Sequence, residues 1–312
     1  MTFLVTGATG KVGRHVVGHL LRAGRRVRAL TRDPAGAGLP ESVEVVRGDL
    51  TDPGTLGPAF DGVEGVHLLT AGGDDYATLR TGPELAGLAE KAGVRRVALL
   101  WNGQVGPVEE AFAASGVEWT GLQAVDFMSN TLAWASAIRA EGEVREPFAD
   151  VPGGVVDEAD VGAVSAAVLV RGGHAGRTYA LTGPQTLSQR QRLAAIAEAT
   201  GRPLRLVELT EEQARRRWRQ AGHGEELIEL LVSWQRDPPP ESTFISPAVR
   251  EITGREPRSF AEWAAEHAAH FGAEPAEAPT LKVQTLKATE TLKATETLKA
   301  TETAETLKAT ES

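Results

Sequence analysis

Three glycines, Gly7, Gly10 and Gly13, follow the first apolar run of the chain within the sequence Thr-Gly-Ala-Thr-Gly-Lys-Val-Gly. In such a pattern the first glycine allows a tight turn from a strand into a helix, and the second lets a pyrophosphate approach the backbone. The third lets the helix pack closely on the strand. Amides at the start of that helix then face the phosphates. The spacing therefore predicts a dinucleotide site.

The residue type at the end of the second predicted strand distinguishes NADP from NAD. An acidic side chain there would bind the ribose 2′-hydroxyl of NAD, whereas an arginine suits the 2′-phosphate of NADP through bidentate hydrogen bonds. This position holds Arg32, which favours NADP. The alternative is NAD, if the adjacent Asp33 pairs with Arg32 and leaves the pocket to the hydroxyl.

Polar and aromatic side chains gather after the fifth and sixth predicted strands, where ligands bind in an open α/β sheet. Asn102 is a candidate hydrogen-bond donor to a developing oxyanion. Asp126 has apolar neighbours that would raise its pKa, so it is a candidate general acid or base, with a helix N-cap as the alternative. Trp101 would stack on a flat substrate or else belong to the core. The residues predicted to contact substrate are Trp101, Gln104, Gln123, Phe127, Asn130 and Trp134.

Short apolar runs alternate with helical patterns through the first half of the chain, and these elements must position the candidate residues. Strands are predicted at 2–6, 26–31, 43–47, 63–69, 95–101 and 117–122. Alternation through short connections indicates an α/β fold with a doubly wound parallel sheet of the Rossmann type. We expect an NAD(P)-binding domain over residues 1–154.

The alternation becomes less regular after about residue 125. A helix is predicted over 127–140, and strands over 177–181 and 204–209. Capping boxes that begin at Thr210 and Ser259 predict two further helix starts. We expect residues 155–272 to form a smaller, mostly helical substrate-binding part that returns strands to the sheet.

Residues 273–312 have a different composition, because Thr-Leu-Lys-Ala-Thr-Glu recurs there with a period of mostly six residues. In an α-helix, residues six apart point in different directions, so the successive leucines would not lie on a common face. The tail is therefore predicted to be a solvated low-complexity segment, with a partner-binding segment as the alternative.

Composition excludes several classes of function. The chain has no cysteine, so neither disulfides nor thiolate metal sites are expected, and its net charge of -9 argues against nucleic-acid binding. His267 and His270 have no third ligand nearby in sequence, so no metal site is expected. The absence of an 18-residue apolar run and of a signal peptide predicts a cytoplasmic protein without membrane association.

A series of motifs through residue 272 resembles the NmrA-like branch of the atypical short-chain dehydrogenase/reductases. Besides the glycine motif, the resemblance rests on Val-Arg-Ala-Leu-Thr-Arg-Asp-Pro at 27–34, Val-Arg-Gly-Asp-Leu-Thr-Asp at 46–52, Gly-Val-Glu-Trp-Thr at 116–120, Asp-Phe-Met-Ser-Asn at 126–130, Leu-Thr-Gly-Pro at 181–184, and the segments at 251–255 and 260–263. That branch includes NADPH-dependent quinone and azo-type reductases, tailoring reductases of secondary metabolism, and redox sensors without catalytic activity.

The resemblance implies a specific set of cofactor contacts. Arg32 would bind the 2′-phosphate, Asp49 and Leu50 the adenine, and Thr70 and Ala71 the ribose. For Asp49 a role in a turn at a helix start is the alternative. The residues implied for the pyrophosphate are Gly7, Thr9, Gly10, Lys11, Val12 and Gly13.

The proton donor usual in the wider superfamily is missing from this sequence. That donor is a tyrosine with a lysine four residues later, but Tyr76 is followed at that distance by Arg80 and Tyr179 by Gly183. Quinones and similar conjugated acceptors need no positioned acid, because their reduced form is a delocalised oxyanion. The leading hypothesis is an NADPH-dependent reductase of a conjugated carbonyl or quinone-like, flat aromatic small molecule, with a homodimer as a candidate assembly. The alternatives are an NADP-sensing regulator without turnover and a non-redox cyclase or dehydratase.

Overall fold

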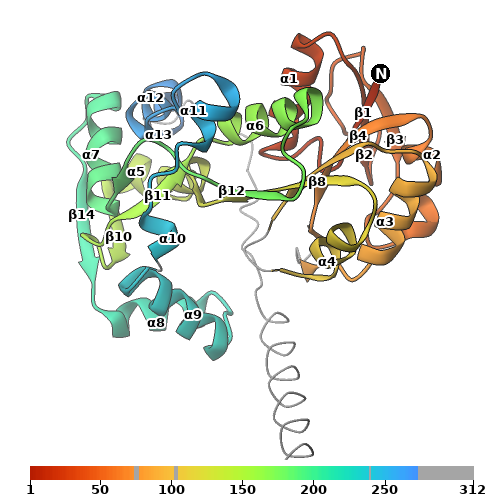
Figure 1. Ribbon diagram of the computed structural model, residues 1–312. Coiled ribbons are helices and arrows are strands. Elements are labelled where there is room, and N and C mark those ends of the chain that lie inside the picture. The colour runs from red at the N-terminus through yellow and green to blue at the C-terminus, as the bar shows by residue number, and fades with distance from the viewer. Residues whose placement is uncertain (74–76, 102–104, 239, 273–312) are drawn as a thin grey trace, which may run out of the picture.

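A parallel sheet of seven strands forms the centre of the computed structural model, which describes residues 1–73, 77–101, 105–238 and 240–272. The strand order is β12-β8-β7-β4-β1-β2-β3 (Figure 1). The order reverses between β1 and β4, so the crevice for a ligand lies at the carboxyl ends of these two strands. The strands are β1 (Thr2–Val5), β2 (Arg26–Thr31), β3 (Glu44–Arg47), β4 (Val63–Leu69), β7 (Arg96–Leu100), β8 (Glu118–Ala124) and β12 (Arg177–Leu181). The predicted doubly wound sheet is confirmed.

Helices cover both faces of this sheet, and each face has its own apolar cluster. Helices α1 (Gly13–Arg22), α6 (Glu158–Arg171) and α11 (Ala248–Thr253) lie on one face. Helices α2 (Gly57–Phe60), α3 (Gly82–Lys91) and α4 (Pro107–Ala114) lie on the other (Figure 1). The buried residues of α1, Val16, Val17 and Leu20, recur at a spacing that places them on one face of the helix. Packing of this face against the sheet stabilises a helix whose other residues are mostly polar.

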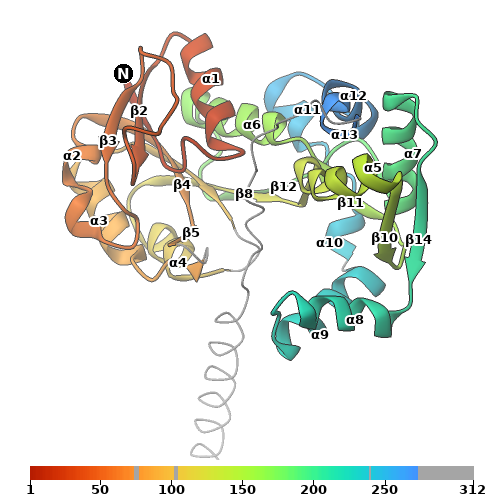
Figure 2. The same cartoon turned by 180° about the vertical axis from the view of Figure 1, so that it is seen from behind.

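The remaining elements form a second lobe beyond the carboxyl ends of the sheet strands (Figure 2). This second lobe comprises β9 (Asp126–Phe127), the 3₁₀ segment η2 (Met128–Trp134), α5 (Ala135–Glu141), β10 (Glu143–Pro147), β11 (Gly153–Val156), β13 (Thr186–Leu187), α7 (Gln189–Thr200), β14 (Arg205–Leu209), α8 (Glu211–Gln220), α9 (Glu225–Arg236), α10 (Pro240–Thr243), α12 (Phe260–Glu266) and α13 (Ala268–Phe271). Trp263, Phe260 and Phe271 are fully buried at its centre. Three short elements of the first lobe remain: η1 (Pro53–Thr55), β5 (Ala71–Gly72) and β6 (Ala77–Thr78).

The two lobes interleave along the chain. The predicted boundary at residue 154 falls within β11, and beyond it α6 packs on α1 while β12 pairs with β8. Gly162 of α6 allows this packing, because a Cβ there would lie 2.6 Å from the Cβ of His15. Helix α6 and strand β12 therefore belong to the first lobe, although they come after the first elements of the second lobe, β9 to β11, along the chain.

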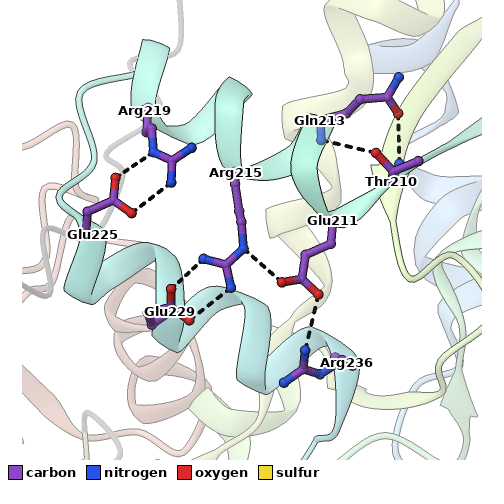
Figure 3. A network of polar contacts seen from close by, with 8 residues as sticks. All are labelled: Thr210, Glu211, Gln213, Arg215, Arg219, Glu225, Glu229 and Arg236. Atoms are coloured by element: carbon purple, nitrogen blue, oxygen red, sulfur yellow. Dashed lines mark hydrogen bonds and ion pairs between the residues drawn. The ribbon is translucent and has the colours of Figure 1, made fainter.

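Helices α8 and α9 form a pair joined by charged side chains (Figure 3). Arg215 of α8 pairs with Glu211 on its own helix and with Glu229 of α9, at 2.8 and 2.5 Å. The predicted capping box is present at the start of α8, where Thr210 and Gln213 exchange hydrogen bonds. The pair is therefore connected mainly through ion pairs around a small apolar centre of Ala214, Trp218, Ile228 and Val232.

The prediction for residues 127–140 was wrong in part. Instead of one helix, Asp126 and Phe127 pair as strand β9 with β11, and a 3₁₀ segment precedes the short helix α5. Local periodicity did not reveal the strand, because its partner lies about 30 residues later. The strand predicted over 204–209 is present as β14, but it pairs with β10 in a separate sheet.

His67 makes the stability of the fold depend on pH. It is fully buried in β4, its Nδ1 lies 2.8 Å from the Ser165 hydroxyl, and burial lowers its pKa from 6.5 to about 4. The unfolded chain therefore binds more protons than the folded one between these values. The free energy of unfolding should fall as the pH drops from 6.5 to 4, by up to about 1.4 kcal/mol per pH unit from this residue.

Urea unfolding at a series of pH values checks this expectation. His67→Gln should show a shallower decline than the unmodified chain, with a remainder from His19, whose pKa burial also lowers to about 4. His270→Gln, at an exposed position, is the control and should keep the full slope. Equal slopes in all three proteins would contradict the assignment.

Candidate cofactor site and active site

The loop of residues 6–13, here called the glycine loop, closes tightly on itself between β1 and α1. Gly7 has a φ of 58°, a left-handed conformation that favours glycine, and its carbonyl accepts a hydrogen bond from the Gly10 amide at 2.9 Å. A Cβ on Gly13 would lie 2.1 Å from the Gly7 carbonyl oxygen. Only glycine at position 13 lets α1 begin this close to the loop.

The start of α1 is left open to an anion. Its N-cap, Val12, provides no side-chain hydrogen bond, and the first turn contains no acidic residue. The guanidinium of Arg14 donates to the carbonyls of Thr9 at 2.7 Å and Gly10 at 3.2 Å, which adds positive charge beside the loop. Uncapped helix amides and a nearby cation fit the pyrophosphate of a dinucleotide. Sequence reasoning did not single out Arg14, although its position in the first turn was a usable signal.

The residues predicted for the adenosine end lie around the carboxyl ends of β2 and β3. Arg32 is exposed directly after β2, and the Asp33 carboxylate accepts a hydrogen bond from the Ala35 amide at 3.2 Å. Asp49 accepts two hydrogen bonds from Thr51, and the Thr51 amide together with the charge of Arg32 holds the Asp49 pKa below its ordinary value. Its carboxylate thus stabilises a turn, the alternative considered for this residue.

Three further observations complete this end of the site. Leu50 is buried in the apolar cluster on the α3 side of the sheet, and its carbonyl accepts a hydrogen bond from the Thr81 hydroxyl. Thr70 is fully buried between β4 and β7, and Ala71 begins β5. A surface hollow of about 160 Å³ separates the glycine loop from the loop after β2, lined by Thr9, Arg14, Val17, Gly18 and residues 37–40.

A chain of polar contacts joins the glycine loop to the second lobe. The ammonium of Lys11 donates to the side-chain oxygen of Asn130 at 2.9 Å, and the Asn130 amide donates to Asp126 at 2.7 Å. The other Asp126 oxygen binds Arg192 of α7 at 2.7 Å. Three residues predicted for the site therefore lie together. Arg192 was missed, because only the placement of α7 brings it there.

A buried acid lies close to this chain. Glu158, the first residue of α6, is 4% exposed, and one of its carboxylate oxygens has no hydrogen-bond partner within the described structure. Burial raises its pKa, while the neighbouring Ser129 and the charge of Lys11 act in the opposite direction. Lys11 thus interacts with one buried carboxyl and with one neutral amide.

The aromatic residues predicted for substrate lie in different environments. Trp101 lines an apolar surface hollow of about 180 Å³ beside α4, together with Leu99, Trp119 and Val105. Gln123 is half-buried in β8, and Phe127 is half-buried against the core on the α1 side of the sheet. Trp134 packs within the second lobe, where its indole donates to Glu146 at 3.0 Å. Asn102 and Gln104 lie outside the described residues.

Among the described residues, no group of three His, Asp or Glu side chains could hold a metal ion. No helix in the described ranges is long and apolar enough to cross a membrane.

Comparisons with known proteins give the chain clear relatives. A family model described as NAD(P)H-binding matches residues 7–171. The chain is 39% identical to the (4-alkanoyl-5-oxo-2,5-dihydrofuran-3-yl)methyl phosphate reductase of Streptomyces griseus, over 87% of this chain and 99% of that protein. It is 34% identical to the NAD(P)H azoreductase of Xenophilus azovorans, over 86% and 99%. The fold matches the Escherichia coli quinone oxidoreductase QOR2 in complex with NADPH, with a TM-score of 0.71 at 23% identity over 85% and 99% of the two chains.

Gly13→Ala should abolish NADP(H) binding and lower the melting temperature, because the new methyl group would overlap the Gly7 carbonyl. Gly87→Ala, within α3 and outside the site, is the control, since a Cβ there would meet nothing within 4 Å. Thermal unfolding and NADPH fluorescence titration measure both effects. Tight NADPH binding by Gly13→Ala would contradict the role of the loop.

Arg32→Ala should weaken NADPH binding by about tenfold or more and leave NADH binding nearly unchanged, because only NADPH carries the 2′-phosphate. Arg26→Ala, at the other end of β2, should change neither affinity. The dissociation constants of both cofactors are compared by titration. An equal loss for NADPH and NADH would mean that Arg32 does not recognise the phosphate.

Proposed function

The chain belongs to the NAD(P)H-binding family, and we propose that it is an NADPH-dependent reductase of a conjugated, quinone-like small molecule, within the NmrA-like branch of the atypical short-chain dehydrogenase/reductases that its motifs resemble. The observation that carries the proposal is the glycine loop, with its uncapped helix start and the nearby guanidinium of Arg14. These features bind and orient a dinucleotide at the point where the strand order reverses.

The names of the two relatives support the substrate class. One names an alkanoyl-oxo-dihydrofuran, whose ring double bond is conjugated with carbonyl groups, and the other an azo compound. In both, a hydride that adds to one end of the conjugated system leaves charge that the rest of the system delocalises. A reductase for such acceptors does not depend on a strong, positioned acid.

The residues of this chain support the same chemistry. When bound, NADPH supplies the hydride. Tyr179 lies in β12 with its hydroxyl 2.8 Å from His174, and Lys91 is at the end of α3, so neither the tyrosine nor the lysine is placed for the usual dyad within the described ranges. Both oxygens of Asp126 accept hydrogen bonds, which suits positioning better than proton transfer. Protonation of the delocalised oxyanion is assigned to water.

The apolar hollow beside Trp101 supports a flat ring as the part of the substrate that is recognised. Its volume of about 180 Å³ is comparable with that of cavities that hold a benzene ring. Trp101 and Trp119 line this hollow, whose surface is almost wholly apolar, as a flat hydrocarbon ring requires. Asn102, beyond the described residues, stays a predicted oxyanion donor.

The proposal is tested by following NADPH absorbance while the chain is supplied with simple quinones, azo dyes and unsaturated lactones. Acceptor-dependent oxidation of NADPH, faster than that of NADH, is the expected result. If NADPH binds but no acceptor is reduced, the chain is instead a dinucleotide sensor or a non-redox enzyme on the same fold.

A further inference from the structure

We propose that Arg192, on α7 of the second lobe, is a positioning residue for NADP(H): it neutralises Asp126, so that Lys11 of the glycine loop keeps its charge for the cofactor. The inference concerns binding and does not depend on the acceptor that the protein reduces. It rests on three hydrogen bonds that connect residue 192 with residue 11 across the two lobes, whose helices α1 and α7 lie far apart in Figure 2.

The chemistry of the three contacts fixes their direction. The Lys11 ammonium can only donate, so Asn130 must present its oxygen to Lys11 and its amide hydrogens to Asp126. The remaining Asp126 oxygen then receives the guanidinium of Arg192. Each side chain in the series is therefore oriented by the next.

Within the described part of the chain, the charges along the series leave Lys11 without a charged partner in contact. Asp126 and Arg192 cancel, whereas the hydrogen bond of the Lys11 ammonium goes to the neutral amide of Asn130. Glu158 is the other acid near Lys11, and its burial favours the neutral form. A positive charge held by a neutral amide at the glycine loop suits the cofactor's phosphates, because no carboxylate has to be displaced first.

Arg192 is built into its position more firmly than a surface arginine. Its side chain is 12% exposed, and a guanidinium nitrogen lies 3.7 Å from where a Cβ on Gly153, the first residue of β11, would be. The capping box of Ser188 and Gln191 fixes the start of α7 at Gln189, three residues before Arg192. Without Arg192, the uncompensated Asp126 would attract the Lys11 ammonium to itself and away from the cofactor.

The experiment measures NADPH dissociation constants for the full chain by fluorescence titration without any acceptor, so failure of the proposed reductase activity does not affect it. Arg192→Gln should raise the dissociation constant about tenfold, and Arg192→Lys should restore part of the affinity. Arg190→Gln is the matched control. It lies on the same helix but pairs with Asp150 on the surface, and it should bind like the unmodified chain.

Two further variants separate positioning from general damage to the fold. In a Lys11→Met background, Arg192→Gln should have no additional effect, because the charge that it protects is gone. Asn130→Asp, which leaves α7 intact and gives Lys11 an anionic partner, should reproduce the loss of affinity even if Arg192→Gln fails to fold. Unchanged affinity in Asn130→Asp, or an equal effect of Arg192→Gln with and without Lys11, would overturn the proposal.

Discussion

The close approach between Gly13 and the Gly7 carbonyl is the constraint on which the rest of the structure depends. Because residue 13 has no side chain, α1 starts directly against the loop, next to the point between β1 and β4 where the strand order reverses. The same placement brings α1 against α6, where Gly162 again removes the side chain at the contact. The absence of a side chain at Gly13 and at Gly162 thus allows the observed positions of the glycine loop and of the helices over one face of the sheet.

Much of the first lobe was predictable from the sequence, because its strands are short, apolar and bounded by turn residues. The predicted bounds of β2 and β4 agree with the structure residue for residue, and the glycine motif indicated the loop between β1 and α1. Those features depend on neighbours along the chain. The positions of β12, after the second lobe begins, and of β10 beside β14 depend on pairing over long distances. The strands β12 and β14 were predicted, whereas β10 and the pairing of β14 with it were not.

The candidate site shows the same division. Lys11, Asp126 and Asn130 were identified separately, from motif and position, without any sign that they touch. Arg192 and Glu158 carry no local signal. One is an arginine within a polar helix, and the other is an acid in a helix first turn, where acids are common. Their significance arises from burial and from charge balance, which only the folded chain provides.

The interleaving of the two lobes has a consequence for synthesis on the ribosome. The sheet lacks its outermost strand until residue 181 has emerged, and α6, which covers the face beside α1, emerges only shortly before. By then β9, η2, α5, β10 and β11 have already left the tunnel and await α7, α12 and α13. Since α11 of the first lobe also follows most of the second lobe along the chain, the two lobes cannot be completed as two domains in succession.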